Sequence, residues 1–329
     1  MPVIPPDTAP DTLVDIAWNE GSVGDWDALF ARVPRSTLLQ SFAYGRAMGR
    51  TYGHVPRLGV IRRGGEPIGL VQTLDRRMLK LFHDRQCHRG PLWLDGVVPD
   101  IDTLEAVFRR LRRACPRSLL GRASLLPELP ASPENEAMLT RCGFQRSGPG
   151  YQTVWFDLSR DEEAMRAGLA RDWRKRLRGA EKAGLTLDVD GQANNLPWLM
   201  KQEHDQAVTK GFRPMTGTLA VRLRNALVKG GGRNDGAVMV TALDGRTPVA
   251  CCLFLRHGAA ATSQVGWASD AGRQSHAMRL VLWRGMQELK QRGVRMLDLG
   301  GINPDAAPGV TEFKLGTGGE VVETVGQYR

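Results

Sequence analysis

Alternating hydrophobic and polar residues mark two strand pairs along the chain. Residues 55–75 contain two β-rich runs around a Gly-Gly turn, and residues 237–258 contain two more around an Asp-Gly turn. Alternation with a period of two indicates strands, and a glycine-containing turn between two such runs indicates a hairpin. The pattern therefore predicts one β-hairpin in each half of the chain, with the two turns about 180 residues apart.

Each hairpin is followed by the same succession of elements. A short apolar run comes next, at 91–94 and at 262–267, and an amphipathic helix follows, at roughly 102–114 and 276–291. A further strand completes each half. The repeated order predicts a mixed α/β (α+β) protein made by a diverged duplication, with a boundary near residues 147–151, SGPGY.

The segment between the two halves has the periodicity of a single helix over residues 165–183. Its apolar positions are Met165, Leu169, Trp173, Leu177 and Ala180. A basic stripe lies on an adjoining face and consists of Arg171, Arg174, Lys175, Arg178 and Lys182. Such a stripe is either a solvated helix surface or a docking surface for phosphate groups.

Length, composition and charge narrow the class of protein. A chain of 329 residues predicts two domains, and its content of 42% hydrophobic and 24% charged residues is typical of soluble globular proteins. The 45 Lys and Arg residues exceed the 35 Asp and Glu residues, which gives a formal charge of +10. This excess favours a polyanionic or phosphate-bearing partner.

Cysteine usage and the start of the chain favour a cytoplasmic location. The five cysteines are odd in number and irregularly spaced, so reduced thiols are expected. The first twenty residues have prolines and acids where a secretory signal needs basic and then apolar residues. No stretch approaches about 18 consecutive apolar residues, so no transmembrane segment is expected.

Four stretches together resemble the Fem aminoacyltransferases and related acetyltransferase-like proteins. Three of them are WRKRLRGAEKAGLTLDV (173–189), DLGGI (298–302) and FKLGTGGE (313–320). The fourth, LLQSFAYGRAMGRTYG (38–53), is similar to a family helix in which a glutamine and a small residue precede an aromatic and then a basic residue. The resemblance covers most of the chain, from about residue 15 to residue 329.

The resemblance implies both a fold and an activity. The fold is two tandem GNAT-like (acyl-CoA N-acyltransferase) domains facing each other across a cleft. Domain 1 is expected at residues 1–149, completed by a C-terminal strand at 317–329, and domain 2 at residues 150–316. The activity is that of an aminoacyltransferase of peptidoglycan synthesis and cell wall biogenesis. It transfers an aminoacyl group from aminoacyl-tRNA to an amine of a UDP- or lipid-linked muramoyl-peptide or a similar acceptor, and a lipid-linked acceptor implies peripheral membrane association.

The resemblance also assigns a catalytic residue. Phe313 and Lys314 match the family's Phe-Lys pair near the C-terminus. Lys314 is expected to stabilise the negative charge that develops when an amine attacks an ester carbonyl, because a fixed cation in a partly dry site stabilises such charge. The competing interpretation is a surface ion pair between Lys314 and Glu312 or Glu320.

Further substrate contacts follow from the same matches. Tyr44 and Arg46 correspond to the family's aromatic residue and the basic phosphate contact after it, and Arg213 in KGFRPMT corresponds to a second basic contact. Paired guanidinium donors suit a diphosphate, so Arg46 and Arg213 are predicted to converge on one ligand. Trp267 is the residue that could fill an expected aromatic contact. Residues of the basic stripe are expected to bind tRNA, namely Arg174, Lys175, Arg178 and Lys182.

Two other functions remain open on the sequence. The first is an acyl-CoA-dependent N-acyltransferase, for which the loop AGRQSHAMR (271–279) supplies only part of the usual pyrophosphate-binding pattern. The second is a non-catalytic, basic RNA-binding protein. No cofactor is predicted apart from the acyl donor, because the chain has no Walker loop, dinucleotide fingerprint or nucleophile elbow. No metal is predicted either, because HDRQCH (83–88) has no second ligand pair at zinc spacing.

Overall fold

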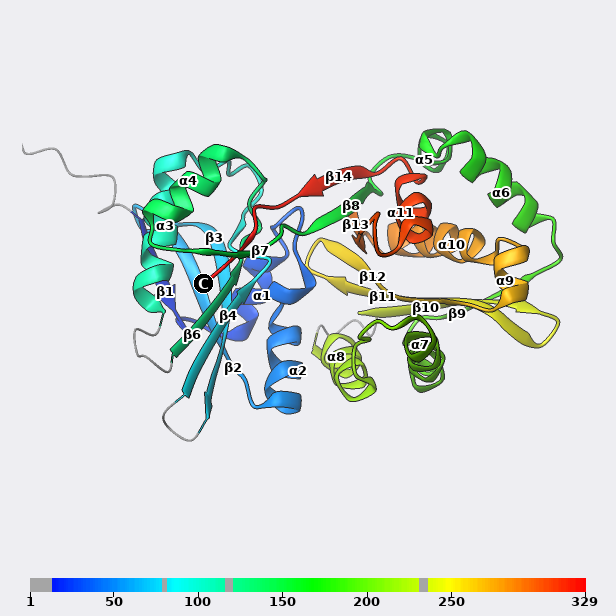
Figure 1. Ribbon diagram of the computed structural model, residues 1–329, viewed down its shortest axis with the longest axis horizontal. Coiled ribbons are helices and arrows are strands. Elements are labelled where there is room, and N and C mark those ends of the chain that lie inside the picture. Colours follow the sequence, from blue (N-terminus) through cyan, green and yellow to red (C-terminus); the bar gives the residue numbers. More distant parts are fainter. Residues whose placement is uncertain (1–13, 79–81, 116–120, 231–235) are drawn as a thin grey trace, which may run out of the picture. The chain divides into compact units, whose positions relative to one another are not determined.

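The computed structural model describes residues 14–78, 82–115, 121–230 and 236–329, so most of the N-terminal segment considered above lies outside the described residues. The chain divides into two compact units (Figure 1). Unit 1 contains the chain through Val33, then His54–Tyr151 and Thr324–Arg329. Unit 2 contains Pro34–Gly53 and Gln152–Glu323.

This division differs from the expected boundaries at residues 150 and 151, which belong to unit 1, and in two longer segments. Residues 34–53 belong to unit 2, where helix α2 (Phe42–Tyr52) packs on helix α8 (Gly217–Gly230) and the Tyr52 hydroxyl lies 3.0 Å from the Thr216 hydroxyl. Residues 317–323 also belong to unit 2, because β14 (Glu320–Glu323) pairs antiparallel with β8 (Gln152–Asp157). The C-terminal residues that complete unit 1 therefore begin at Thr324.

Unit 1 is built on one sheet in the order β1-β2-β3-β4-β6-β15-β7, with β5 paired to β3. Helix α3 lies against this sheet, and Val107 and Phe108 on its apolar face are completely buried in the core. The strands are β1 (Val14–Trp18), β2 (Val55–Arg63), β3 (Glu66–Met78), β4 (Phe82–His88), β5 (Leu92–Trp93), β6 (Gly121–Leu126), β7 (Arg146–Gly148) and β15 (Gln327–Tyr328). The helices are α1 (Val23–Phe30), α3 (Ile101–Ala114) and α4 (Pro133–Arg141).

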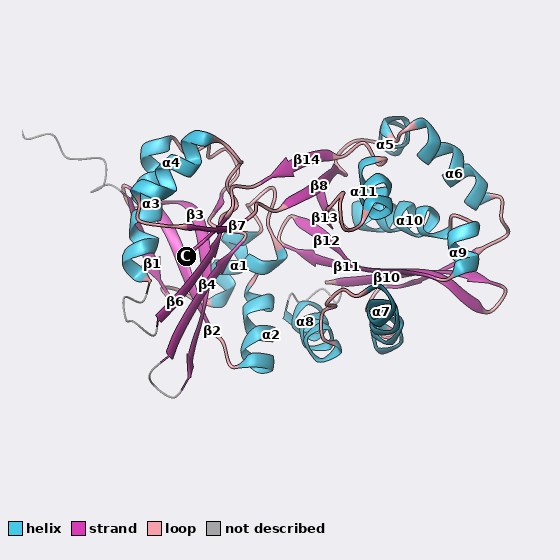
Figure 2. Ribbon diagram, in the orientation of Figure 1, coloured by secondary structure: helices cyan, strands magenta, loops and turns pink. Residues whose placement is uncertain are grey.

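Unit 2 is built on a second sheet, in the order β14-β8-β13-β12-β11-β10-β9. Helices α10 and α11 lie on one side of it and helices α7 and α8 on the other (Figures 1 and 2). The strands are β8 (Gln152–Asp157), β9 (Thr186–Asp190), β10 (Ala237–Asp244), β11 (Thr247–His257), β12 (Ala260–Ala268), β13 (Met296–Gly301) and β14 (Glu320–Glu323). Its helices, besides α2 and α8, are η2 (Leu38–Gln40), α5 (Glu162–Gly168), α6 (Arg171–Glu181), α7 (Leu196–Lys210), α9 (Asp270–Gln274), α10 (Ala277–Gln291) and α11 (Pro308–Leu315).

The predicted mixed α/β organisation and both predicted hairpins are confirmed. Strands β2 and β3 pair across the Gly-Gly turn, and β10 and β11 pair across the Asp-Gly turn. In unit 1 the hairpin is followed by β4, the short strand β5, an amphipathic helix and strand β6, and in unit 2 by the longer strand β12, two helices and strand β13. The predicted order of strand, helix and strand therefore recurs in both units, with β4 and α9 in addition. Of the described helices, none is long and apolar enough to cross a membrane.

The single helix predicted over residues 165–183 is wrong, because the structure has two helices there. Helix α5 ends at Gly168, Leu169 has an extended backbone, and α6 begins at Arg171. At the break the Leu169 side chain is buried in the core, while the Ala170 N–H donates to the Gly316 carbonyl at 2.9 Å. These contacts replace the helical hydrogen bonds that the break gives up. The apolar residues on either side of the break keep the spacing of a single helix, so the periodicity of the sequence did not reveal the break.

Close packing of α10 on the sheet yields a stability test. A Cβ added at Gly285 would lie 2.2 Å from the Phe254 ring of β11, whereas one added at Gly179 on α6 would meet nothing within 4 Å. We expect Gly285→Ala to destabilise the protein by about 1–3 kcal/mol through overpacking. Gly179→Ala, the matched control, should be neutral or stabilising by up to about 1 kcal/mol, since alanine favours helix. Urea unfolding followed by circular dichroism measures both, and equal effects at the two sites would contradict this account.

Candidate active site

The candidate site begins where the two parallel strands of unit 2 separate. Strand β12 pairs with β13 only at three positions, the last joining Thr262 to Asp298. The buried Asp298 carboxylate accepts hydrogen bonds from the Thr153 hydroxyl and from the Gly300 N–H, the latter at 2.8 Å. Gly300 has φ +79°, a conformation that favours glycine, and the pairing of β13 with β8 is irregular between Asp298 and Gly301. Asp298 therefore holds β13 in the bend that parts it from β12.

A pocket of about 550 Å³ lies at this separation and reaches both faces of the sheet. On one face it is lined by side chains of α10 and α11, among them Met278, Arg279 and Lys314. On the other face, where α7 packs on β12, it is lined by Gln206 and Lys210. The opening between the strands thus joins the α10 side of the sheet to the α7 side.

The lining of this pocket is strongly basic. It includes five cationic residues and a single acid, Glu312, which lies 4.0 Å from one of them. The cationic residues are Arg176, Lys210, Arg273, Arg279 and Lys314. Such an excess of positive charge in a concave site attracts phosphate-bearing ligands.

Arg279 is held between two aromatic rings. Its guanidinium carbon lies 5.7 Å from the centre of the Trp173 ring and 5.4 Å from that of Phe313. The Trp173 indole N–H donates to the Phe313 carbonyl at 3.0 Å, which fixes the two rings relative to each other. Burial and the nearby Arg176 lower the pKa of Arg279, and its Nε is buried without a hydrogen-bond partner among the residues described. The aromatic contacts orient this cation in the pocket.

Lys314 lies in the last turn of α11 and lines the same pocket. Its ammonium donates to the Gly301 carbonyl at 2.8 Å. Burial lowers the pKa of Lys314, while Asp298 and Cys252 oppose the shift. Within the described part of the chain, Glu312 pairs with Arg176 and Glu320 with Arg35, so neither forms the alternative ion pair with Lys314.

The other substrate contacts expected from the sequence lie elsewhere in unit 2. Tyr44 and Arg46 are partly buried on α2, while Arg213 is exposed just before α8, the helix on which α2 packs. Trp267 packs edge-on against Trp198 of α7, with ring centres 5.3 Å apart. None of these residues lines the pocket that contains Phe313 and Lys314.

The basic stripe is mostly exposed on α6. Lys175, Arg178 and Lys182 are solvent-exposed, whereas the Arg174 guanidinium donates to the Ala167 carbonyl at 2.6 Å. Arg176, which was not counted in the stripe, is the α6 cation that reaches the pocket. The stripe and the pocket are therefore adjoining features of one helix.

Sequence reasoning missed Glu203 on α7. Leu196, Leu199 and Ala207 of this helix are buried, and Glu203 shares their spacing. Burial raises the pKa of Glu203 to about 7. An acid at a core-facing position of a helix was the signal that could have revealed it.

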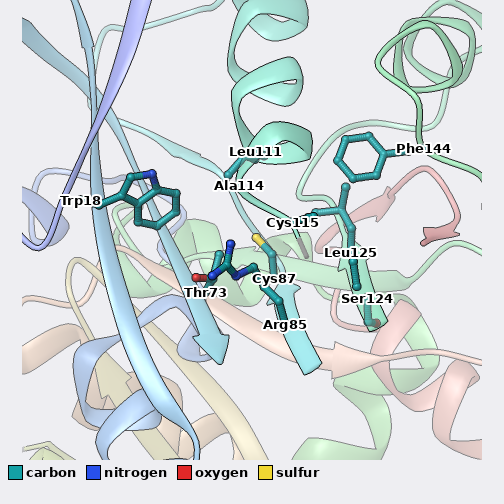
Figure 3. Close-up of a pocket in the computed structure, with 11 residues that line it drawn as sticks. Trp18, Thr73, Arg85, Cys87, Leu111, Ala114, Cys115, Ser124, Leu125 and Phe144 are labelled. Atoms are coloured by element: carbon teal, nitrogen blue, oxygen red, sulfur yellow. The ribbon is translucent and has the colours of Figure 1, made fainter. Parts of the chain in front are cut away.

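HDRQCH (83–88), for which no metal was predicted, forms most of strand β4 in the sheet of unit 1. A small apolar cavity lined by Trp18, Cys87 and Leu111 lies against the same strand (Figure 3). Within the described residues, no group of three or more His, Cys, Asp and Glu side chains could hold a metal ion. None of the five cysteines, all of which lie in the described part of the chain, forms a disulfide.

Comparison with known proteins bears on the fold around this site. Residues 167–320, which contain every residue that lines the pocket, match the family model described as an acetyltransferase (GNAT) domain. The solved structure of FemX is 15% identical, with 95% of this chain and 96% of that chain covered and a TM-score of 0.76. The chain has the tandem GNAT fold.

Two further solved structures have the same fold. One is a tandem GNAT protein from the clavulanic acid biosynthesis pathway, without AcCoA, which is 16% identical over 96% of this chain and 97% of that chain, with a TM-score of 0.55. The other is a conserved protein of unknown function from Bacteroides thetaiotaomicron, 12% identical over 95% and 98%, with a TM-score of 0.56. No curated protein matches. The match to the GNAT domain model supports an acyltransferase, and the solved structures show the fold.

The raised pKa of Glu203 predicts a pH-dependent stability. The folded protein keeps this carboxyl protonated up to about pH 7, whereas the ordinary value is 4.5, so stability falls as the pH rises through that window. Glu203→Gln removes the buried charge. The variant should therefore gain stability relative to the parent between pH 5 and pH 8, by about 1 kcal/mol, because Glu203 is only partly buried and solvent screens its charge. Urea unfolding of the parent and the variant at pH 5 and at pH 8 measures this gain in the free energy of unfolding. Asp205→Asn, on the exposed side of α7, is the control, and an equal gain there would contradict the account.

Proposed function

We propose that this protein transfers an aminoacyl group from aminoacyl-tRNA to an amine of a peptidoglycan precursor or a similar acceptor. The observation that carries the proposal is the basic pocket between β12 and β13, which contains Lys314 and the aromatic-bound Arg279. A pocket of this charge suits a donor whose reactive ester lies next to phosphates. The overall likeness to FemX supports the same class of reaction on the same fold.

The reaction needs little beyond alignment and charge stabilisation. The aminoacyl ester is already activated, so an acceptor amine attacks its carbonyl carbon directly. Negative charge develops on the carbonyl oxygen and then on the departing ribose oxygen. The Lys314 ammonium, held at Gly301, stabilises that charge in a partly buried site where its effect is large.

Cys252 lies in the same pocket but is a poor nucleophile. Its thiol lies 3.3 Å from the Ser263 hydroxyl, and burial raises its pKa to about 12. The reactive form of cysteine is the thiolate, which is scarce at neutral pH with such a pKa. Direct attack by the amine therefore fits the pocket better than an acyl-cysteine intermediate.

The remaining cations are assigned to the phosphates of the two substrates. Arg176 and Arg279 in the pocket, together with the exposed basic stripe of α6, suit the acceptor stem of the tRNA. Arg46 and Arg213 suit the diphosphate of a UDP- or lipid-linked acceptor, as the family resemblance implies. Both belong to unit 2, where α2 packs on α8.

One observation favours acyl-CoA as the donor instead. Helix α10 begins at the pocket, and its N-cap residue His276 makes no side-chain capping hydrogen bond, so backbone N–H groups remain available to a pyrophosphate. His276 itself has φ +58°. Acyl-CoA-dependent N-acyl transfer is the second candidate on this ground.

Assays with each donor distinguish aminoacyl-tRNA from acyl-CoA as the substrate. The protein is incubated with an amine acceptor, a muramoyl-pentapeptide carrying a free lysine amine, and either charged tRNA or acetyl-CoA. Amide formation with deacylation of tRNA supports the proposal. Release of free thiol with acetylation of the amine supports the second candidate. Neither product, over a panel of charged tRNAs and acyl-CoA thioesters, would refute both.

Removing the charge of Lys314 should slow the chemistry. Lys314→Met keeps the aliphatic stem, so we expect turnover to fall by roughly 10²-fold while substrate affinity changes little. The measurement is kcat and KM with the donor that the assays identify. Lys201→Met changes an exposed lysine that pairs with Asp205 and does not line the pocket, and it should have normal kinetics. Normal turnover of Lys314→Met would show that Lys314 is not the catalyst.

Charge reversal on α6 tests tRNA binding. Lys175→Glu with Arg178→Glu should weaken tRNA binding and reduce its dependence on salt, because fewer counterions are released. Filter binding at salt concentrations from roughly 50 to 200 mM measures the tRNA affinity and its salt dependence, because phosphate contacts weaken over that range. Arg246→Glu with Arg295→Glu changes the net charge equally at exposed positions off α6 and serves as the control. Equal effects of the two pairs would mean that the stripe has no specific part in binding.

A further inference from the structure

The backbone on both sides of Lys314 is held by hydrogen bonds from residues outside α11. The carbonyl of Phe313, which belongs to the peptide group that precedes Lys314, accepts from the Trp173 indole N–H at 3.0 Å. The carbonyl of Lys314 accepts from the Thr317 hydroxyl at 2.6 Å and from the Thr317 N–H at 3.1 Å. Because a peptide group is planar, fixing the groups on either side of a Cα atom fixes the direction in which its side chain leaves the backbone.

Of these contacts, the one from Trp173 joins two separate helices. Phe313 lies in the last turn of α11, where carbonyls lack a partner within the helix, and the Thr317 N–H donates to Lys314 instead. The indole N–H from α6 takes that place. Trp173 is 2% exposed in the core of unit 2, and its ring centre lies 5.9 Å from that of Phe313. An enclosed donor of this kind holds its acceptor carbonyl in one position.

The break between α5 and α6 brings Trp173 to the end of α11. After α5 ends at Gly168, the Ala170 N–H donates to the Gly316 carbonyl at 2.9 Å. The indole lies so close to Gly316 that a Cβ there would be 2.7 Å from the Trp173 Cδ1 atom. In a continuous helix the Ala170 N–H would donate four residues back along its own helix. The break therefore releases this N–H to hold the segment that follows Lys314.

We propose that Trp173 is a positioning residue for acyl transfer and that it acts through Lys314. This inference rests on the proposed function. The indole holds the backbone from which Lys314 extends, and the ammonium then meets the Gly301 carbonyl at 2.8 Å. No bond is made or broken at Trp173 itself. Misplacement of a catalytic group by about 1 Å can cost as much as roughly 10²-fold in rate, so one such hydrogen bond has a measurable effect on turnover.

Trp173 contacts Arg279 in a different way. The guanidinium carbon of Arg279 lies 5.7 Å from the centre of the Trp173 ring, and this attraction needs an aromatic face, not an N–H. Phenylalanine at position 173 keeps an aromatic ring and removes the donor, whereas leucine removes both. The two substitutions therefore separate the effect on Lys314 from the effect on Arg279.

The first test compares Trp173→Phe and Trp173→Leu with the parent, using the donor and amine that the assays identify. We expect Trp173→Phe to lower kcat by roughly 10-fold with a smaller change in KM, because Lys314 is misplaced while Arg279 keeps an aromatic neighbour. Trp173→Leu should lower kcat as well and also raise the KM of the donor. Circular dichroism checks that each variant folds. A normal kcat in folded Trp173→Phe would overturn the proposal.

A double-mutant cycle shows whether Trp173 acts through Lys314. In Lys314→Met the ammonium is absent, so adding Trp173→Phe should cause little further loss of kcat. Trp283→Phe is the matched control, because Trp283 is also buried in the core of unit 2 and does not line the pocket. It should leave kcat unchanged with or without the Lys314 substitution. An equal loss from Trp173→Phe in both backgrounds would refute a role through Lys314.

Lysine labelling separates failure of this inference from failure of the proposed function. Competitive labelling of amines with acetic anhydride over a range of pH, read by mass spectrometry, gives the pKa of Lys314 without any substrate. Burial lowers this pKa, so if Lys314 moves into water in Trp173→Phe, its pKa should rise toward the ordinary value of 10.5. Trp283→Phe should leave the pKa unchanged.

The labelling result is decisive whether or not the parent is active. If the parent transfers no acyl group and the pKa of Lys314 rises in Trp173→Phe alone, the proposed function fails while the positioning of Lys314 by Trp173 stands. If that pKa is the same in Trp173→Phe as in the parent, the positioning role is refuted, and the proposed function is judged by the donor assays alone.

Discussion

The site depends on the bend that Asp298 imposes on β13. A buried carboxylate must be satisfied, and here its partners are the Thr153 hydroxyl and the backbone N–H of Gly300. Those bonds hold the backbone in a conformation that needs a glycine and that prevents β13 from continuing alongside β12. The opening that results admits a ligand through a sheet that would otherwise be closed by hydrogen bonds.

The basic pocket shows how aromatic side chains hold a cation in place. Arg279 lies against Trp173 and Phe313, and the hydrogen bond from the indole to the Phe313 carbonyl ties α6 to α11. Residue Phe313 thus fixes the backbone from which Lys314 extends. A substitution of Trp173 would disturb the orientation of both cations, although Trp173 itself does not line the pocket.

Glu203 and Lys314 illustrate two opposite effects of burial. In both, removal from water disfavours the charged form, which raises the pKa of the acid and lowers that of the amine. The cost is stability, because each charged form is less well solvated than at the surface.

The sequence by itself determined the local elements and the likeness to tandem GNAT proteins. Period-two runs around Gly-Gly and Asp-Gly turns defined the hairpins, and the apolar faces of α3 and α10 defined the main helices, because these patterns depend on neighbours close in the chain. Lys314 was identified in the same way, from a short contiguous motif.

Only the tertiary structure decided which residues meet. The break at Leu169 depends on a hydrogen bond to Gly316, nearly 150 positions away, so helical periodicity across residues 165–183 could not reveal it. The allocation of residues 34–53 to unit 2 depends on the packing of α2 against α8. Arg176, Arg279 and Lys314 come from three helices, and they become one basic site because β12 and β13 part between them. Periodicity records which face of a helix is buried, but only packing determines what that face is buried against.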